Sequence, residues 1–228
     1  MKKLIITAIM ILGFSEIQSQ IIEDYPFKTY LDNDNYLYLT GNEQISNSKD
    51  IYIAKYPPAN GSGYWKYQFP NSMGDDRGFD LIVDDHGNVF VTGFIYSNLS
   101  NSNKIVTIAL NSDGTENWIK YTDYYSDDKG MGIEIAKNVN GYATEVYISG
   151  YITNHGTGKD FIIKGYNAED GDTTNQIHQI TPLPGNQVAT DILLDDFHAY
   201  VVGYTTEADG INTDIKIQTY DLGSNSLS

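Results

Sequence analysis

Short blocks of β-branched and aromatic residues recur along the chain, and polar segments rich in Asn, Asp, Gly and Ser separate them. Within each block, apolar and polar positions partly alternate with a period of two, which is typical of β-strands. The polar segments have the composition of turns. After residue 19 no stretch carries a convincing apolar stripe with the 3.6-residue period of a helix. The pattern therefore predicts an all-β protein.

The blocks belong to an internal repeat. Glycines that close one block stand at positions 41, 93, 150 and 203, so successive copies are 52, 57 and 53 residues apart. An aromatic residue precedes each glycine by three positions: Tyr38, Phe90, Tyr147 and Tyr200. A second apolar block follows each glycine after a polar loop, and the first two copies add a block containing a tryptophan, Trp65 or Trp118. We expect Tyr38, Tyr147, Tyr200 and Trp118 to lie in the core.

Each copy fits four short antiparallel strands, with boundaries near 27–78, 79–130, 131–188 and 189–228. The sequence Asp85-His86-Gly87-Asn88 between two apolar blocks predicts a hairpin with a positive φ at Gly87. A single sheet of this kind cannot bury both of its faces, whereas sheets stacked around an axis can. The repeat therefore predicts a β-propeller of about four four-stranded blades.

Residues 79–93 read FDLIVDDHGNVFVTG, with an apolar strand, an Asp-x-x-Gly-Asn turn and a Val-aromatic-Val-Thr-Gly strand. This segment resembles the SBBP-type β-propeller repeat of secreted bacterial proteins. The other copies depart from the pattern at the turn: the first has Asn33-Asp34-Asn35, the third has a longer turn over 138–143, and the fourth lacks the glycine. The resemblance extends over most of residues 28–220. It implies the propeller fold and says almost nothing about function.

The N-terminus has the pattern of a secretory signal peptide. Lys2 and Lys3 precede an apolar run over 4–14, and a polar segment follows over 15–20. The apolar run is shorter than the ~20 residues that a membrane-spanning helix needs. We assign residues 1–19 to the signal and 20–228 to the propeller repeats; an N-terminal strand or buried helix is the alternative. The sequence thus predicts a secreted, cell-surface or periplasmic protein.

The last copy ends after its third expected strand, and residues 221–228 form a polar tail. Propellers close with about four to eight blades. The boundaries favour an incomplete part of a longer propeller, and a compact four-bladed propeller is the alternative.

The composition excludes several classes of partner. The formal net charge of −16 argues against binding to nucleic acid or to an anionic membrane surface. No segment after the N-terminus is apolar enough to span a membrane. The chain has no Cys, which excludes disulfides, thiolate metal sites and cysteine nucleophiles.

Two acidic linkers are the main candidate binding residues. Asp75-Asp76-Arg77 precedes the second copy, and Asp127-Asp128-Lys129 precedes the third. In a propeller these linkers share one rim with the loops between the second and third strands. Paired carboxylates could bind Ca²⁺ or act as acid and base on a glycan. The simpler interpretation is that each pair caps a turn and is neutralised by Arg77 or Lys129.

Tyrosines in the rim loops could stack on a sugar: Tyr96, Tyr124, Tyr125, Tyr151 and Tyr204. The sequence lacks the Asp-rich pattern of a dedicated calcium loop, and its four His residues stand at unrelated repeat positions. We therefore predict no metal and no cofactor. No nucleophile elbow, Ser-His-Asp order or phosphate-binding loop is present, so we name no catalytic residue.

The leading hypothesis is a secreted, non-enzymatic module or scaffold that binds a protein or glycan through loops on one rim. One alternative is a carboxylate-based glycan hydrolase or lyase built on a propeller. A second alternative is a truncated fragment of a larger exported protein.

Overall fold

The computed structural model describes residues 25–45, 47–59, 61–69, 74–123, 126–154, 156–177, 185–207, 212–223 and 226–227. The residues expected to form the signal peptide, and the rim tyrosines Tyr124 and Tyr125, lie outside the described residues. Among the described residues, no helix is long and apolar enough to cross a membrane.

The described residues form four antiparallel sheets of four strands, each a meander in chain order. The first sheet contains β1 (Tyr25–Leu31), β2 (Leu37–Ile45), β3 (Ser48–Tyr56) and β4 (Trp65–Gln68). The second contains β5 (Arg77–Val83), β6 (Val89–Ser97), β7 (Ser102–Leu110) and β8 (Glu116–Thr122). The third contains β9 (Lys129–Lys137), β10 (Ala143–Asn154), β11 (Gly158–Asn167) and β12 (Thr173–Ile177). The fourth contains β13 (Asn186–Leu194), β14 (His198–Thr206), β15 (Thr213–Asp221) and β16 (Ser226–Leu227).

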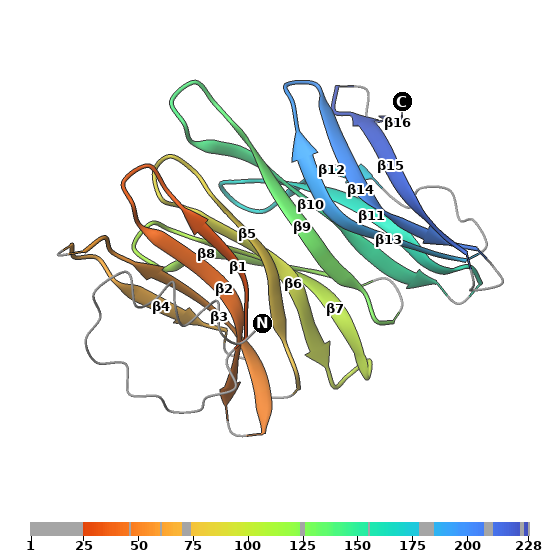
Figure 1. Cartoon of the computed structure of the whole chain (residues 1–228), viewed down its shortest axis with the longest axis horizontal. Coiled ribbons are helices and arrows are strands. Elements are labelled where there is room, and N and C mark those ends of the chain that lie inside the picture. Colours follow the sequence, from red (N-terminus) through yellow and green to blue (C-terminus); the bar gives the residue numbers. More distant parts are fainter. Residues whose placement is uncertain are drawn as a thin grey trace.

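The four sheets follow one another in space as they do in sequence. Figure 1 shows the first sheet and the fourth sheet at opposite ends of the stack. The first strands of successive sheets contact each other, β1 with β5, β5 with β9 and β9 with β13, as the inner strands of propeller blades do. The all-β class and the four blade-like sheets expected from the repeat are therefore confirmed.

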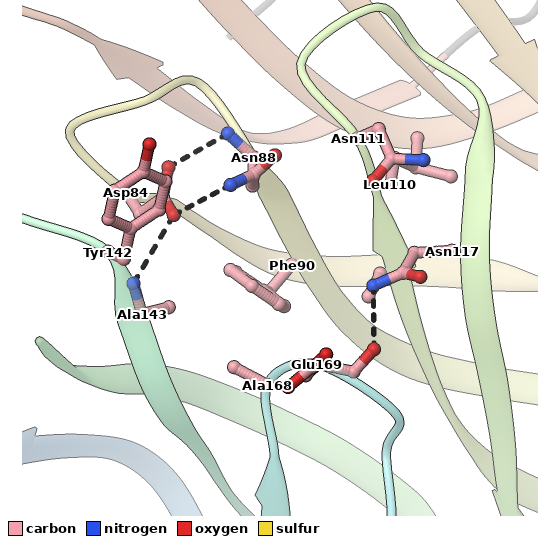
Figure 2. Close-up of a pocket in the computed structure, with 11 residues that line it drawn as sticks. Asp84, Asn88, Phe90, Leu110, Asn111, Asn117, Tyr142, Ala143, Ala168 and Glu169 are labelled. Atoms are coloured by element: carbon pink, nitrogen blue, oxygen red, sulfur yellow. Dashed lines mark hydrogen bonds between the residues drawn. The ribbon is translucent and has the colours of Figure 1, made fainter.

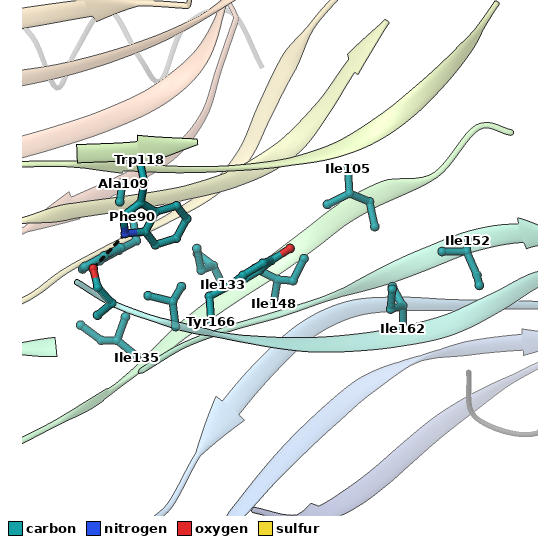
Figure 3. Close-up of a cluster of buried hydrophobic side chains, with 12 residues drawn as sticks. Phe90, Ile105, Ala109, Trp118, Ile133, Ile135, Ile148, Ile152, Ile162 and Tyr166 are labelled. Atoms are coloured by element: carbon teal, nitrogen blue, oxygen red, sulfur yellow. Dashed lines mark hydrogen bonds between the residues drawn. The ribbon is translucent and has the colours of Figure 1, made fainter. Parts of the chain in front are cut away.

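Each gap between neighbouring sheets is filled by apolar side chains from both. Between the second and third sheets, Phe90, Ile105 and Trp118 pack against Ile133 and Ile148 (Figure 3). Trp118 is 6% exposed, as expected, and its Nε1–H donates to the carbonyl oxygen of Ala168 at 2.9 Å. Because the core consists of these interfaces, the stability of each sheet depends on its neighbours.

The turn between the first and second strands of every sheet is held by one Asp or Asn. In the second sheet, the Asp84 carboxylate accepts the N–H groups of His86 and Asn88 at 3.0 and 2.9 Å. Gly87 has the expected positive φ, +83°. The residues that do the same in the other sheets are Asp32, Asn138 and Asp195. A side chain that bonds the backbone two residues on is enough to form the turn, so the glycine can be absent.

Two sequence expectations are wrong. The fourth sheet has a fourth strand, because Tyr220 and Asp221 of β15 pair with Leu227 and Ser226. A two-residue strand is too short to show an alternating pattern. Tyr200 is exposed rather than buried, unlike Tyr38 and Tyr147, because no described sheet lies against its side of the fourth sheet.

Candidate functional site

The acidic linkers bind backbone groups of the two sheets that they join. Asp76 is fully buried, its Oδ1 accepts the N–H of Tyr96 in the second sheet at 2.7 Å, and its own N–H donates to the Lys49 carbonyl in the first sheet. Asp128 repeats this one sheet later, with Oδ1 accepting the Thr153 N–H at 2.8 Å. Each of the two carboxylates therefore binds its linker to a hairpin of the following sheet, and both do so on the same rim.

The other members of the two linkers divide between ion pairs and ring contacts. Asp75 is exposed, and its Oδ1 accepts the N–H of Lys49 at 3.2 Å. Asp127 lies 3.1 Å from the Nζ of Lys129, the neutralising pair that the sequence suggested. The guanidinium of Arg77 instead stacks between Phe27 and Phe94, with its carbon 5.9 and 6.0 Å from the ring centroids. The linker carboxylates thus bind backbone groups of the neighbouring sheets rather than cap a turn of their own, and Arg77 serves packing rather than charge balance.

A third copy of this linker was missed because amides replace its carboxylates. The Oδ1 of Asn186 accepts the N–H of Lys159 at 3.1 Å, as Asp75 accepts that of Lys49. Gln187 is fully buried at the position of Asp76 and Asp128, and its Oε1 accepts from Lys216 at 2.8 Å. The repeat spacing was the available signal, since positions 76, 128 and 187 are 52 and 59 residues apart.

The described rim tyrosines do not converge on a common cleft. The ring of Tyr96 is half-buried and packs on the linker at Gly74. Tyr151 is only 4% exposed, Lys159 Nζ lies 4.1 Å from its ring centroid, and burial raises the pKa of its hydroxyl. Tyr204 is exposed on the outer side of the fourth sheet. The rim therefore offers no platform of stacked rings among the described residues.

A cavity of about 200 Å³ lies at the opposite ends of the strands, between the second and third sheets. Phe90 forms its floor, as Figure 2 shows, with the hairpin of Asp84 on one side and the turn of Glu169 on the other. The amides that line it belong to Asn88, Asn111 and Asn117. The remaining lining residues are Leu110, Ala109, Tyr142, Ala143 and Ala168.

Asp84 gives the cavity its shape. It is buried, its Oδ1 accepts the two turn N–H groups, and its Oδ2 accepts Asn88 Nδ2 at 2.9 Å and the Ala143 N–H at 3.3 Å. The last bond crosses to the third sheet. The carboxylate accepts four N–H groups in all, and these bonds hold the cavity walls of the second and third sheets together.

Aromatic and amide contacts complete the walls. The His86 ring stacks on Tyr142 with centroids 3.4 Å apart, and Asn117 Nδ2 donates to the Glu169 carbonyl at 3.0 Å. Sequence reasoning missed this cavity because its walls come from positions more than fifty residues apart, and only the stacking of two sheets brings them together.

Charged residues also meet along the inner strands. Lys28 Nζ lies 2.8 Å from Asp80 Oδ1, and Asp80 Oδ2 accepts the Ile133 N–H at 3.0 Å. Burial raises the pKa of Asp80 and outweighs the opposing effect of Lys28. Burial likewise raises the pKa of Glu134, and the charges of Asp80 and Asp191 add to that rise. Among the described residues, no three His, Asp or Glu side chains form a group able to hold a metal ion.

Comparison with known proteins gives a distant structural likeness. No family model matches the chain, and no curated protein matches it significantly. Among solved structures, an α-L-arabinanase of Cellvibrio cellulosa in complex with arabinohexaose is similar at 14% identity and a TM-score of 0.38. The match covers 89% of this chain and 75% of that one.

Proposed function

We propose that this chain is a secreted or cell-surface binding module of the SBBP propeller type. It holds one polar unit of a glycan in the cavity between the second and third sheets, without chemical conversion. The observation that carries the proposal is the amide-lined cavity itself, with Asn88, Asn111 and Asn117 around Phe90. The signal-like N-terminus and the repeat at 79–93 support the location and the type.

The chemistry of the walls suits sugar hydroxyls. An amide side chain both donates and accepts hydrogen bonds, as a hydroxyl does. The exposed Tyr142 supplies ring surface for the apolar face of a sugar, and the buried Phe90 closes the floor of the cavity. The cavity is smaller than the roughly 300 to 1,000 Å³ of sites for drug-sized ligands, which suits a single terminal or branching unit.

The hydrogen bonding of the nearby carboxylates favours binding over catalysis. Asp84 is bonded by four N–H donors, and Asp76 and Asp128 bind backbone N–H groups on the far rim. A general acid or base must reach the proton that it moves. None of these three presents an oxygen to the cavity in that way.

A glycan array with the full chain, followed by calorimetry on the best ligand, tests the proposal. We expect the double substitution Asn111→Ala and Asn117→Ala to weaken binding at least tenfold, since it removes two amide partners. Asn47→Ala, an exposed asparagine on the other rim, is the matched control and should bind normally. Unchanged binding by the double variant, or no glycan bound at all, would refute the cavity as the site.

A specific observation also favours glycan hydrolysis as a second candidate. Burial raises the pKa of Glu134 on an inner strand, which is the direction in which the pKa of a general acid is shifted. A polysaccharide panel with reducing-end detection tests this activity. Sugar release that Glu134→Gln abolishes would support it, whereas release unaffected by that substitution, or none at all, would exclude it.

A further inference from the structure

The outer side of the fourth sheet is an uncovered apolar surface, which we call the end face. Ile215 is 82% exposed and Ile217 is 70% exposed. The other apolar members of the end face are also exposed: Leu193, Tyr200, Val202 and Tyr204. The strand registers place Val202 beside Ile217 and Tyr204 beside Ile215, so these side chains form one patch.

The same repeat positions are buried in every preceding sheet. Ile215 corresponds to Ile51, Ile105 and Phe161, and all three are 0% exposed. Tyr200 corresponds to Tyr38, Phe90 and Tyr147, which are also buried. In each case the next sheet covers them. The end face therefore has the composition of an interface between sheets, although no sheet of the described residues covers it.

The first sheet presents the complementary surface, which we call the start face. Leu31 is 61% exposed, and Leu37, Leu39, Tyr52 and Tyr56 on the same side are half-buried. Their counterparts in the second sheet are the residues that pack against the first sheet: Val83, Val89, Val91, Val106 and Leu110. The start face is thus the kind of surface that an end face covers inside the stack.

We infer that the end face of one copy docks on the start face of a second copy of this chain. The two faces lie at opposite ends of one molecule (Figure 1), so both stay uncovered in a single copy. Each inner interface already joins these two kinds of face, and the docking continues that series. A two-fold pair joined through both contacts would cover the end face and the start face of each copy.

The charges on the inner strands act on one another within a single copy. Lys28 pairs with Asp80 of the second sheet, and the charge of Asp191 in the fourth sheet also acts on Lys28. Asp191 holds the repeat position of Asp80, is exposed, and accepts the N–H of the residue after it as Asp80 does. The docking therefore rests on the two apolar faces and not on an ion pair between copies.

Pro26 limits how closely the two faces can approach each other. Pro26 stands at the repeat position of Gly78, Gly130 and Ala189. A Cβ at Gly78 would collide with the Thr40 hydroxyl, and Val202 holds the Thr40 position on the end face. The Pro26 ring therefore meets Val202 in the docked pair. Pro26→Gly should tighten the association, an effect that a contact elsewhere on the surface would not show.

Sedimentation equilibrium of the full chain over a range of concentrations is the test. We expect a reversible species of twice the mass of a single chain. Substitution of both Ile215 and Ile217 by Lys on the end face should give monomers, and so should Leu31→Lys with Leu39→Lys on the start face. Leu99→Lys, at a fully exposed leucine outside both faces, should leave the dimer intact. Circular dichroism checks that each variant is folded.

Two results would overturn the inference: a monomer at all concentrations, or a dimer that survives either the start-face variant or the end-face variant. A dimer lost only in the end-face variant would mean that two end faces meet each other. A cysteine pair, Pro26→Cys with Val202→Cys, separates docking between copies from closure of one chain, because the chain has no other Cys. A disulfide between two chains supports the inference, and one within a single chain refutes it.

Discussion

At the scale of single residues, buried carboxylates in this protein serve the backbone. Asp76 and Asp128 each reach one N–H group in the following sheet and are shielded from water. From sequence alone, the same residue types at the same spacing left a calcium or catalytic site open beside the simpler interpretation that each pair caps a turn. The sequence shows that two carboxylates are adjacent, but not which of their oxygens face a backbone donor.

We predict that Asp76→Ala lowers the free energy of unfolding by about 1 to 3 kcal/mol, because it leaves the half-buried N–H of Tyr96 without its acceptor. Urea denaturation measures the change. Asp75→Ala, one residue earlier and exposed, is the control and should cost less. Equal losses for the two variants would show that the bond between Asp76 and Tyr96 does not stabilise the linker.

Asp195 makes a pH-dependent contribution to the free energy of unfolding, again through a single side chain. The Tyr200 hydroxyl donates to its Oδ2 at 2.7 Å, and this bond, with the N–H groups of Phe197 and His198, lowers its pKa to about 2. An unfolded Asp titrates near about 3.9. The stabilisation is therefore complete above about pH 4 and is lost as the pH falls through about 2.

We predict that, between pH 4 and pH 2, the free energy of unfolding falls less steeply in Asp195→Asn than in the wild type. Urea midpoints at half-unit pH steps measure the slope, and the exposed neighbour variant Asp196→Asn should keep the wild-type slope. An identical slope in wild type and Asp195→Asn would mean that the turn and the Tyr200 bond do not persist in solution.

At the scale of strands, the repeat predicted most elements because each carries a local signal. The closing glycines are required where the chain passes closest to itself: a Cβ at Gly93 would collide with the carbonyl oxygen of Arg77. The third and fourth copies were harder to interpret. Gln187 keeps the burial of Asp76 without its charge, and β16 is too short to alternate.

The candidate site was harder to predict from the sequence than the strands were. Asn88 and Phe90 belong to the second sheet, whereas Tyr142 and Ala168 belong to the third. No spacing rule joins them, because the cavity depends on how two sheets pack. A repeat identifies the positions that face a neighbouring sheet, but not the gap that remains between the two.

At one contact between neighbouring sheets, a larger residue on one strand is matched by a smaller residue on the facing strand. A Cβ at Gly130 would collide with the Thr92 hydroxyl. The next interface has Ala189 in place of Gly130, and there Ser149 replaces the threonine. The Ser149 hydroxyl makes no hydrogen bond in the structure, whereas that of Thr92 donates to the Val106 carbonyl at 3.2 Å.

We therefore predict that Gly130→Ala destabilises the protein by about 1 to 3 kcal/mol through overpacking. Thr92→Ser should recover part of the loss, because a serine hydroxyl can rotate away as it does at Ser149. A double-mutant cycle by urea denaturation measures the coupling. Strictly additive effects would show that these two side chains do not meet between the sheets.

At the scale of the whole molecule, the four sheets form a series in which, among the described residues, the apolar side chains of each sheet pack against its neighbours in the series. The second and third sheets are covered on both sides, whereas the first and fourth are covered on one. In such a series, stability is close to a sum of sheet and interface contributions, and opening can begin at an end.

Hydrogen exchange should follow this order, with the amides of β6 and β10 protected most and those of β2 and β14 less. Ile192 packs at the interface of the third and fourth sheets, so Ile192→Ala should speed exchange in the fourth sheet and leave the second sheet nearly unchanged. Ile148→Ala, between the second and third sheets, is the comparison and should reduce protection more widely.

Uniform protection in all four sheets would instead indicate a single cooperative unit. If two copies dock end to start, the same experiment at rising protein concentration should increase protection in the first and fourth sheets alone, since only those sheets gain a covering neighbour.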